Sequence, residues 1–132
     1  MSPESESRVR VRYAETDQMG VAYHGNYFAW FEVGRTDLLR VLGLTYKDME
    51  RGGLRLPVIE AQARFLRPAF YDDVLDIRTR LSSLGGARLA FAYEVRRDGA
   101  AAPLATGSTS HAAVDLAGRP RRLPHDLRRL LQ

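Results

Sequence analysis

The chain has 132 residues, of which 45% are hydrophobic and 27% charged, and this size and balance predict one globular domain with a single core. It contains no cysteine, which excludes disulfides, thiolate nucleophiles and cysteine-based zinc or iron–sulfur sites. No apolar run reaches the roughly 18 residues of a membrane span, and the N-terminus lacks a secretory signal pattern, so we expect a cytoplasmic protein.

The net charge of +4 is carried by arginines, because Lys47 is the only lysine. Such a charge fits binding to polyanions. The scarcity of asparagine, glutamine and cysteine fits a heat-adapted, thermophilic protein at least as well. The basic residues are spread along the chain and form no block, which argues against a nucleic-acid partner.

The first third of the chain predicts a strand, a loop and a long helix. Residues 1–7 are expected to form a flexible acidic tail, and residues 8–13 alternate as a strand with three side chains on one face, Val9, Val11 and Tyr13. After a loop at 14–25, apolar residues recur at three- and four-residue spacing. They predict a helix of about 17 residues with Asn26 as its N-cap and Gly43 after its end. The helix is apolar around much of its circumference, so we expect a sheet to bury it.

The remaining residues predict a short helix and four strands. Thr45 resembles the N-cap of a helix that ends at 52–53. Alternation predicts strands at 58–67, 74–81, 89–95 and 104–116, with a last helical turn at 124–131. Residues 1–132 therefore form one α+β domain, a five-stranded antiparallel sheet that bends around the long helix. Such a sheet leaves an open edge and an uncovered outer face, which predicts at least a homodimer.

Residues capable of chemistry are concentrated between Tyr13 and Tyr27. A carboxylate, Asp17, lies in a loop that turns at Gly20 and leads into a helix N-terminus near His24. Free backbone N–H groups at a helix N-terminus bind an anion or a polarised carbonyl oxygen. A carboxylate facing them is the minimum needed to add water to an acyl carbonyl. The alternative interpretation is that Asp17 caps a turn and His24 is a surface residue.

The same stretch resembles a known family. The run Asp17-Gln-Met-Gly-Val-Ala-Tyr-His-Gly-Asn-Tyr27, followed by Trp30-Phe31-Glu32 and Arg35, is similar to the 4-hydroxybenzoyl-CoA thioesterase family, above all its YbgC/FadM-like acyl-CoA thioesterases. Residues 65–73 resemble that family's connection between its second and third strands. The resemblance covers about residues 8–123. It implies the hotdog fold, in which the sheet wraps around a central helix.

The resemblance also implies roles for single residues. Asp17 matches the catalytic carboxylate, which acts either as a nucleophile that gives a mixed anhydride or as a general base for water. His24 matches the position whose backbone N–H polarises the thioester carbonyl. Tyr23 and Asn26 flank this turn beside the substrate and are expected to hold its shape and not to react. Gly25 allows close approach of the backbone.

Other candidates are weaker. Glu15 is a second carboxylate, but its spacing from Asp17 is expected to turn it to the opposite side. Glu32 is expected to pair with Arg35. The other histidines have no metal-ligand spacing with His24, so we expect no metal and no cofactor, coenzyme A entering only as part of the substrate.

The sequence therefore predicts an acyl-CoA thioesterase that releases a free acid and CoA, with a site shared between subunits of a homodimer that could pair into a homotetramer. Guanidinium groups suit phosphate oxygens, and three arginines near strand ends or turns are candidates for the CoA phosphates: Arg64, Arg67 and Arg88. Two alternatives stay open, a non-catalytic acyl-CoA-binding hotdog protein and a hotdog enoyl-CoA hydratase or dehydratase.

Overall fold

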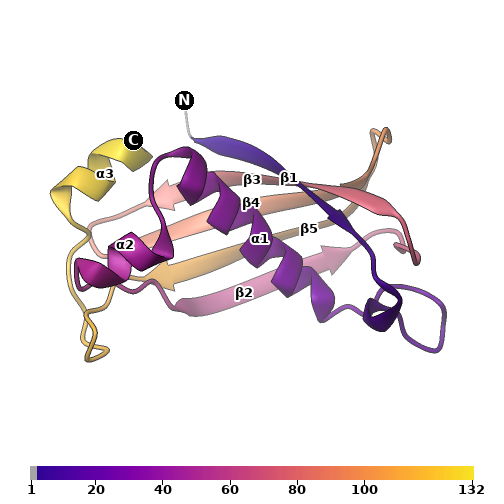
Figure 1. Ribbon diagram of the computed structural model, residues 1–132, viewed down its shortest axis with the longest axis horizontal. Coiled ribbons are helices and arrows are strands. Elements are labelled where there is room, and N and C mark those ends of the chain that lie inside the picture. The colour runs from indigo at the N-terminus through magenta and orange to yellow at the C-terminus, as the bar shows by residue number, and fades with distance from the viewer. Residues whose placement is uncertain (1–2) are drawn as a thin grey trace.

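The computed structural model describes residues 3–132, which form one antiparallel sheet with a long helix across one face (Figure 1). The sheet order is β1-β3-β4-β5-β2. The strands are β1 (Glu4–Arg10), β2 (Val58–Phe65), β3 (Val74–Leu84), β4 (Arg88–Arg97) and β5 (Pro103–Ala112). The helices are the 3₁₀ turn η1 (Tyr13–Glu15), α1 (Asn26–Val41), α2 (Tyr46–Arg51) and α3 (His125–Leu131). The predicted α+β class and five-stranded sheet are confirmed.

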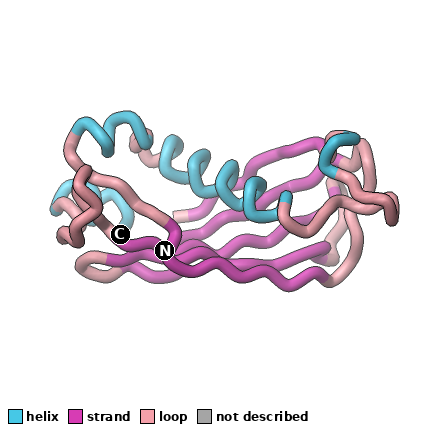
Figure 2. Tube along the Cα trace, turned by 90° about the horizontal axis from the view of Figure 1, so that it is seen from below, coloured by secondary structure: helices cyan, strands magenta, loops and turns pink. Residues whose placement is uncertain are grey.

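Helix α1 forms the core together with the inner face of the sheet, and the opposite face of the sheet carries neither α1 nor α2 (Figure 2). Phe31 is fully buried and stacks on Tyr93 of β4, with ring centroids 4.3 Å apart and an interplanar angle of 7°. Gly107 of β5 lies beneath Phe31, where an added Cβ would come within 2.4 Å of the ring. The small residue is therefore required at this point of the helix–sheet contact.

Most predicted elements are confirmed near their predicted ends. Thr45 caps α2 by accepting a hydrogen bond from the backbone N–H of Asp48 at 3.1 Å. Gly43 follows α1 with φ +84°, a backbone conformation that favours glycine. Alternation along β4 places Leu89, Phe91, Tyr93 and Val95 on one face, and all four are buried.

The predicted flexible tail at residues 1–7 is wrong for the part that the structure describes, and residues 1–2 lie outside the described residues. Glu4 to Ser7 are the first half of β1 and pair with β3. Glu6 lies opposite Arg78, and their side chains form an ion pair at 2.8 Å. These polar residues belong to the sheet because their partners lie about 70 positions later in the chain, which local hydrophobic alternation does not reveal.

Two finer predictions near the loop are also wrong. Tyr13 does not share a strand face with Val9, because β1 ends at Arg10 and the Tyr13 side chain in η1 is 77% exposed. Asn26 is the first residue of α1 and not its N-cap, which is Gly25. The side-chain amide of Asn26 instead donates to the backbone oxygen of Glu15.

Candidate active site

Residues 15–23 form a small hairpin that delivers the chain to the start of α1. The backbone N–H of Tyr23 donates to Glu15 O at 2.8 Å, and that of Asp17 donates to Val21 O at 3.0 Å. The tip turns at Gly20, whose φ of +81° favours glycine. The backbone N–H of Ala22 donates to Ala69 O at 2.8 Å, which fixes the hairpin to the segment after β2.

Asp17 lies half-buried on this hairpin. Its Oδ1 accepts a hydrogen bond from the backbone N–H of Met19 at 2.9 Å, while its Oδ2 has no hydrogen-bond partner within residues 3–132. The side chain therefore does cap a turn, which is the alternative role that the sequence left open for Asp17. It also keeps one carboxylate oxygen free to act on a substrate or a water molecule.

The chain at His24 and Gly25 presents backbone donors at the head of α1. The N–H groups of Asn26 and Tyr27 already donate, to Tyr23 O at 3.0 Å and to His24 O at 3.2 Å. Within the described part of the chain, the N–H groups of His24 and Gly25 have no acceptor. Two adjacent free donors at a helix N-terminus form an arrangement suited to an oxyanion.

Glu15 has a different use from Asp17, and the sequence did not predict it. Glu15 is buried, and its Oε1 accepts from the backbone N–H of Arg12 at 2.8 Å while its Oε2 accepts from Trp30 Nε1 at 3.2 Å. Its carbonyl oxygen accepts from Asn26 Nδ2 at 2.7 Å. Both carboxylate oxygens of Glu15 are thus occupied, and the residue holds the hairpin against α1.

Aromatic rings line the approach to the free donors. The exposed His24 ring lies 4.3 Å from the Tyr23 ring and 6.1 Å from that of Phe65, the last residue of β2. Phe65 also meets the buried Tyr27 ring at 5.0 Å. Burial raises the pKa of Tyr27 above its usual value of 10, so its hydroxyl stays neutral at physiological pH.

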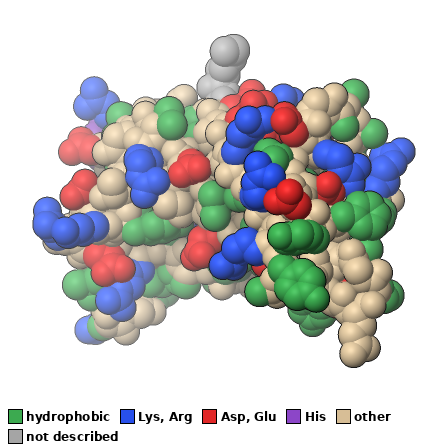
Figure 3. Space-filling view, turned by 45° about the vertical axis from the view of Figure 1, so that its right-hand side comes forward, with side chains coloured by type: hydrophobic (Ala, Val, Ile, Leu, Met, Phe, Trp, Pro, Cys, Tyr) green, Lys and Arg blue, Asp and Glu red, His purple; other side chains and the backbone are tan. Residues whose placement is uncertain are grey.

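Several large hydrophobic side chains are exposed at the hairpin end of the molecule. Hydrophobic side chains reach solvent there among arginines and carboxylates (Figure 3). They are Tyr13, Met19, Leu66, Phe70 and Tyr71. The candidate site therefore opens beside a surface suited to an amphipathic ligand.

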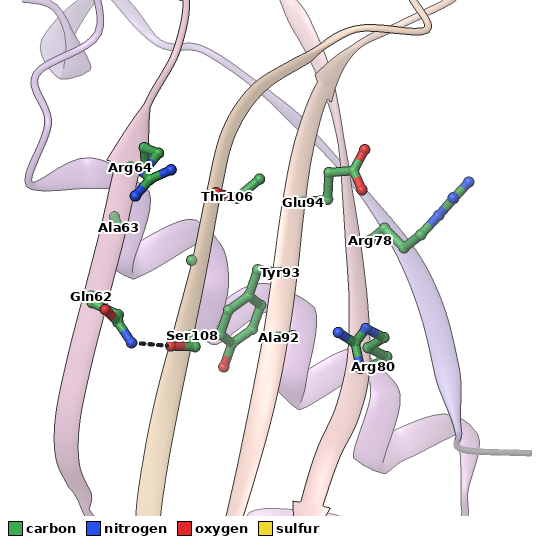
Figure 4. A pocket seen from close by; sticks show the side chains of 11 residues that line it. Gln62, Ala63, Arg64, Arg78, Arg80, Ala92, Tyr93, Glu94, Thr106 and Ser108 are labelled. Atoms are coloured by element: carbon green, nitrogen blue, oxygen red, sulfur yellow. Dashed lines mark hydrogen bonds between the residues drawn. The ribbon is translucent and has the colours of Figure 1, made fainter.

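The three candidate arginines lie in separate places. Arg64 lines a groove of about 540 Å³ on the outer face of the sheet, on the side away from α1 (Figure 4). Arg67 follows β2, is exposed and donates to Pro103 O at 3.3 Å. Arg88 starts β4 and pairs with Ala112, at the opposite end of the sheet from Phe65. A single chain therefore brings Arg64 and Arg67, but not Arg88, to the hairpin end.

Residues 3–132 contain no group of three or more His, Cys, Asp or Glu side chains placed to hold a metal ion. In the same described range, no helix has both the length and the apolar character to cross a membrane.

Comparison with known proteins gives the family. Residues 11–131 match the model of the Thioesterase-like superfamily. The chain belongs to this family. The predicted resemblance and the predicted enzyme class, a thioester hydrolase, are thereby confirmed.

Named members of the family are similar along most of their length. Acyl-CoA thioesterase YbgC of Haemophilus influenzae is 34% identical over 109 residues, which cover 82% of this chain and 79% of YbgC. The crystal structure of DHNA-CoA thioesterase from Staphylococcus aureus has a TM-score of 0.91 at 34% identity and covers 96% of this chain and 87% of that chain.

A 4-hydroxybenzoyl CoA thioesterase structure covers 99% of this chain and 100% of that chain, with a TM-score of 0.90 at 19% identity. This likeness confirms the hotdog fold.

Proposed function

We propose that this thioesterase hydrolyses acyl-CoA to a free acid and CoA. The observation that carries the proposal is the pair of free backbone N–H groups at His24 and Gly25, in the same short loop as the free oxygen of Asp17. The N–H groups stabilise the oxyanion that forms when the thioester carbonyl is attacked, and one such donor is typically worth about 3–4 kcal/mol in the transition state. Asp17 attacks the carbonyl or activates a water that does so.

The acyl-CoA substrate is supported by the names of relatives. YbgC of Haemophilus influenzae is named an acyl-CoA thioesterase, and the Staphylococcus aureus structure is that of a CoA thioesterase. The exposed Tyr23 ring, which contacts the His24 ring, and the hydrogen bond from Asn26 Nδ2 to Glu15 O keep the turn at His24 in place around the thioester. Guanidinium groups bind phosphate oxygens well, so the exposed Arg67 at this end suits the CoA phosphates. In this proposal Arg64, on the outer face of the sheet, and Arg88, from a second subunit, are further phosphate contacts.

The working unit in this proposal is a homodimer formed through β2. Strand β2 pairs with β5 on one side only, and no strand within the described residues covers its other edge. Three of its hydrophobic side chains are close to half exposed: Val58 at 45%, Ile59 at 48% and Phe65 at 46%. An open apolar edge strand is a template for pairing with another chain.

The direct test is release of free thiol from a panel of acyl-CoA esters by the wild type and by Asp17→Asn. The side-chain amide oxygen of this variant can still accept from Met19 N–H, so the turn is kept while the charge is lost. We expect turnover to fall roughly 10²–10⁴-fold.

Asp37→Asn is the matched control, because Asp37 lies on α1 and forms a surface ion pair with Arg40 at 3.2 Å. It should leave turnover unchanged. Near-normal turnover in Asp17→Asn would remove Asp17 from the mechanism. Hydration of an enoyl-CoA without thiol release would identify a hydratase, and ligand binding with no turnover would identify a binding protein.

A further inference from the structure

Charge is divided unevenly between the last segment of the chain and the rest. Although basic residues occur along the whole sequence, residues 1–116 contain 15 basic and 15 acidic side chains. Residues 117–132 contain five arginines and one aspartate, so this segment carries the whole net charge of +4. Charge of one sign that is concentrated in one region attracts groups of the opposite sign.

Residues 117–132 are held against the end of the molecule opposite the hairpin (Figure 1). The backbone N–H of Leu123 donates to Gly86 O, in the turn between β3 and β4, at 2.8 Å. Two leucines of α3, Leu127 and Leu131, are buried. The charges of the segment are therefore fixed at one end of the fold.

Four arginines of this segment form what we call the basic end surface: Arg121, Arg122, Arg128 and Arg129. Two of them flank one glycine, because an added Cβ at Gly86 would lie 3.5 Å from Arg122 Nη2 and 4.0 Å from Arg128 Nη1. Arg128 Nη1 also donates to Gly85 O at 2.6 Å. The fold thus brings like charges together around a single turn.

None of these four guanidinium groups has a carboxylate partner within residues 3–132, and the hydrogen bonds that Arg121 and Arg128 donate all go to backbone oxygens. Elsewhere surface arginines do pair with acids, as Arg78 does with Glu6 at 2.8 Å. Uncompensated like charges repel one another, so this surface gains most from an anionic partner.

An apolar side chain and a polar hollow lie beside the basic end surface. Leu130 follows Arg129 on α3 and is 48% exposed. A hollow of about 450 Å³ lies between α3 and the end of β3, and its polar lining includes Ser82, Ser83 and Arg128. Hydroxyl and guanidinium groups donate to phosphate oxygens, and an exposed leucine can enter the apolar boundary of a bilayer.

These features favour a lipid surface over a nucleic acid. Residues 117–132 contain no Phe, Tyr or Trp on which a base could stack. A phosphate backbone also offers no apolar environment for Leu130. An anionic bilayer offers both phosphate groups for the arginines and hydrocarbon for the leucine.

We propose that the basic end surface docks the protein on membranes of anionic phospholipid. Each basic residue near such a surface strengthens binding about fivefold, and the four arginines act together. The inference goes beyond the proposed function, because this surface lies at the end of the chain's fold opposite Asp17. Acyl-CoA esters are amphipathic, so docking would place the enzyme where such esters gather.

Sedimentation of the whole protein with vesicles tests the proposal. The protein should bind vesicles that contain phosphatidylglycerol and stay in solution with vesicles of phosphatidylcholine alone. Raising the salt concentration should release it, because salt screens the attraction. Arg122→Glu combined with Arg129→Glu should weaken binding roughly twentyfold or more.

Arg40→Glu combined with Arg80→Glu is the matched control, since it changes the net charge equally. Arg40 lies on α1 and Arg80 on β3, and both are exposed. This control should bind vesicles nearly as well as the wild type. Far-ultraviolet circular dichroism and urea unfolding check that both double variants fold. Equal loss of binding in both would overturn the proposal, because total charge and not this surface would then decide binding.

A tryptophan at position 130 reports the orientation on the membrane, because the one natural tryptophan, Trp30, is buried. The fluorescence of Leu130→Trp should shift to shorter wavelength when phosphatidylglycerol vesicles are added. Met19→Trp, at an 80% exposed position on the hairpin, should show no shift. A shift in Met19→Trp alone would place the bilayer at the opposite end and overturn the proposal.

Binding of poly(U) by a wild type that ignores the vesicles would also overturn it, because the partner would then be a nucleic acid. The vesicle measurements need no turnover. Absence of thiol release from every ester would refute the proposed function and leave the docking result standing.

Discussion

At the scale of single residues, Glu15 and Asp17 show how environment separates two carboxylates that are close in sequence. Glu15 is buried and gives both carboxylate oxygens to fixed donors, Arg12 N–H and Trp30 Nε1. Asp17 gives only Oδ1 to the turn. An oxygen already held by structural donors has little capacity left for chemistry, so Asp17 is the candidate for catalysis and Glu15 the positioning residue.

His111 is a buried titratable group that the proposed mechanism does not use. Its Nδ1–H donates to Leu56 O at 2.9 Å, so its Nε2, 2.8 Å from Thr109 Oγ1, accepts from that hydroxyl. Burial lowers the pKa of His111 below its usual value of 6.5, against the bond to Leu56, which raises it, and nearby Arg35 lowers it further. The folded state therefore holds His111 neutral.

This lowered pKa predicts acid sensitivity. The unfolded chain takes up a proton near pH 6.5 while the folded chain resists it, so the contribution of His111 to stability is present above pH 6.5 and is lost as pH falls below it. The free energy of unfolding of the wild type, measured with urea, should therefore fall from pH 7.5 to pH 5 more steeply than that of His111→Gln. His125→Gln, at an exposed site on α3, should follow the wild type. Parallel curves for the wild type and His111→Gln would refute the prediction.

At the scale of elements, the contact between α1 and β3 depends on a missing side chain. Gly34 is buried in the middle of α1, and an added Cβ would come within 2.2 Å of Thr79 Oγ1 and 3.1 Å of Ile77 Cγ2. Thr79 Oγ1 is itself buried with no hydrogen-bond partner within residues 3–132. Glycine costs about 1 kcal/mol in a helix interior relative to alanine, and close packing on the sheet is what offsets that cost here.

The packing predicts an unusual pair of effects on stability. Gly34→Ala should destabilise the fold by about 1–3 kcal/mol through overpacking, although alanine is the better helix former. Thr79→Ala removes Thr79 Oγ1, the atom nearest to the added Cβ. The double variant should therefore recover much of the lost stability. Urea unfolding of the wild type, both single variants and the double variant measures the coupling. Strictly additive effects would contradict the proposed contact.

At the scale of the whole molecule, β2 is the least covered part of the sheet. The strand is exposed or half-exposed along its length, although its residues alternate as a strand buried on one face would. Alternation in the sequence favours a shared face for Ile59, Ala61, Ala63 and Phe65. In the single chain Ala63 packs against the core and the Phe65 ring contacts Tyr27, but Ile59, Ala61 and Phe65 stay exposed. A second copy paired through β2 would cover the rest.

Ala61 lies near the middle of β2 and is exposed in the single chain. Ala61→Asp should therefore leave the monomer folded. In a dimer paired through β2 it would bring two carboxylates close together across the two-fold axis. We expect a monomer by light scattering coupled to gel filtration, with thiol release lost in parallel. Leu130→Asp on α3 should stay dimeric and active. A dimeric, active Ala61→Asp would refute pairing through this edge.

The sequence determined those parts of the molecule that depend on patterns within a few neighbouring residues. The length of α1, the Thr45 cap and the glycine after α1 follow from spacing and capping within a few residues. The inward face of β4 follows from alternation. The loop with Asp17 and His24 could be predicted as a site because its chemically capable residues lie close together in the sequence, in an order that resembles one family.

The tertiary structure decided whatever joins distant positions. Glu4 to Ser7 became strand because β3 offered partners such as Arg78, and Glu15 became a brace because Trp30 turns toward it. Met49 of α2 and Val114 after β5 line one hollow of about 420 Å³, although no local sequence pattern connects them. Hydrophobic periodicity records which face of an element is apolar, but what covers that face is fixed only when non-local elements pack.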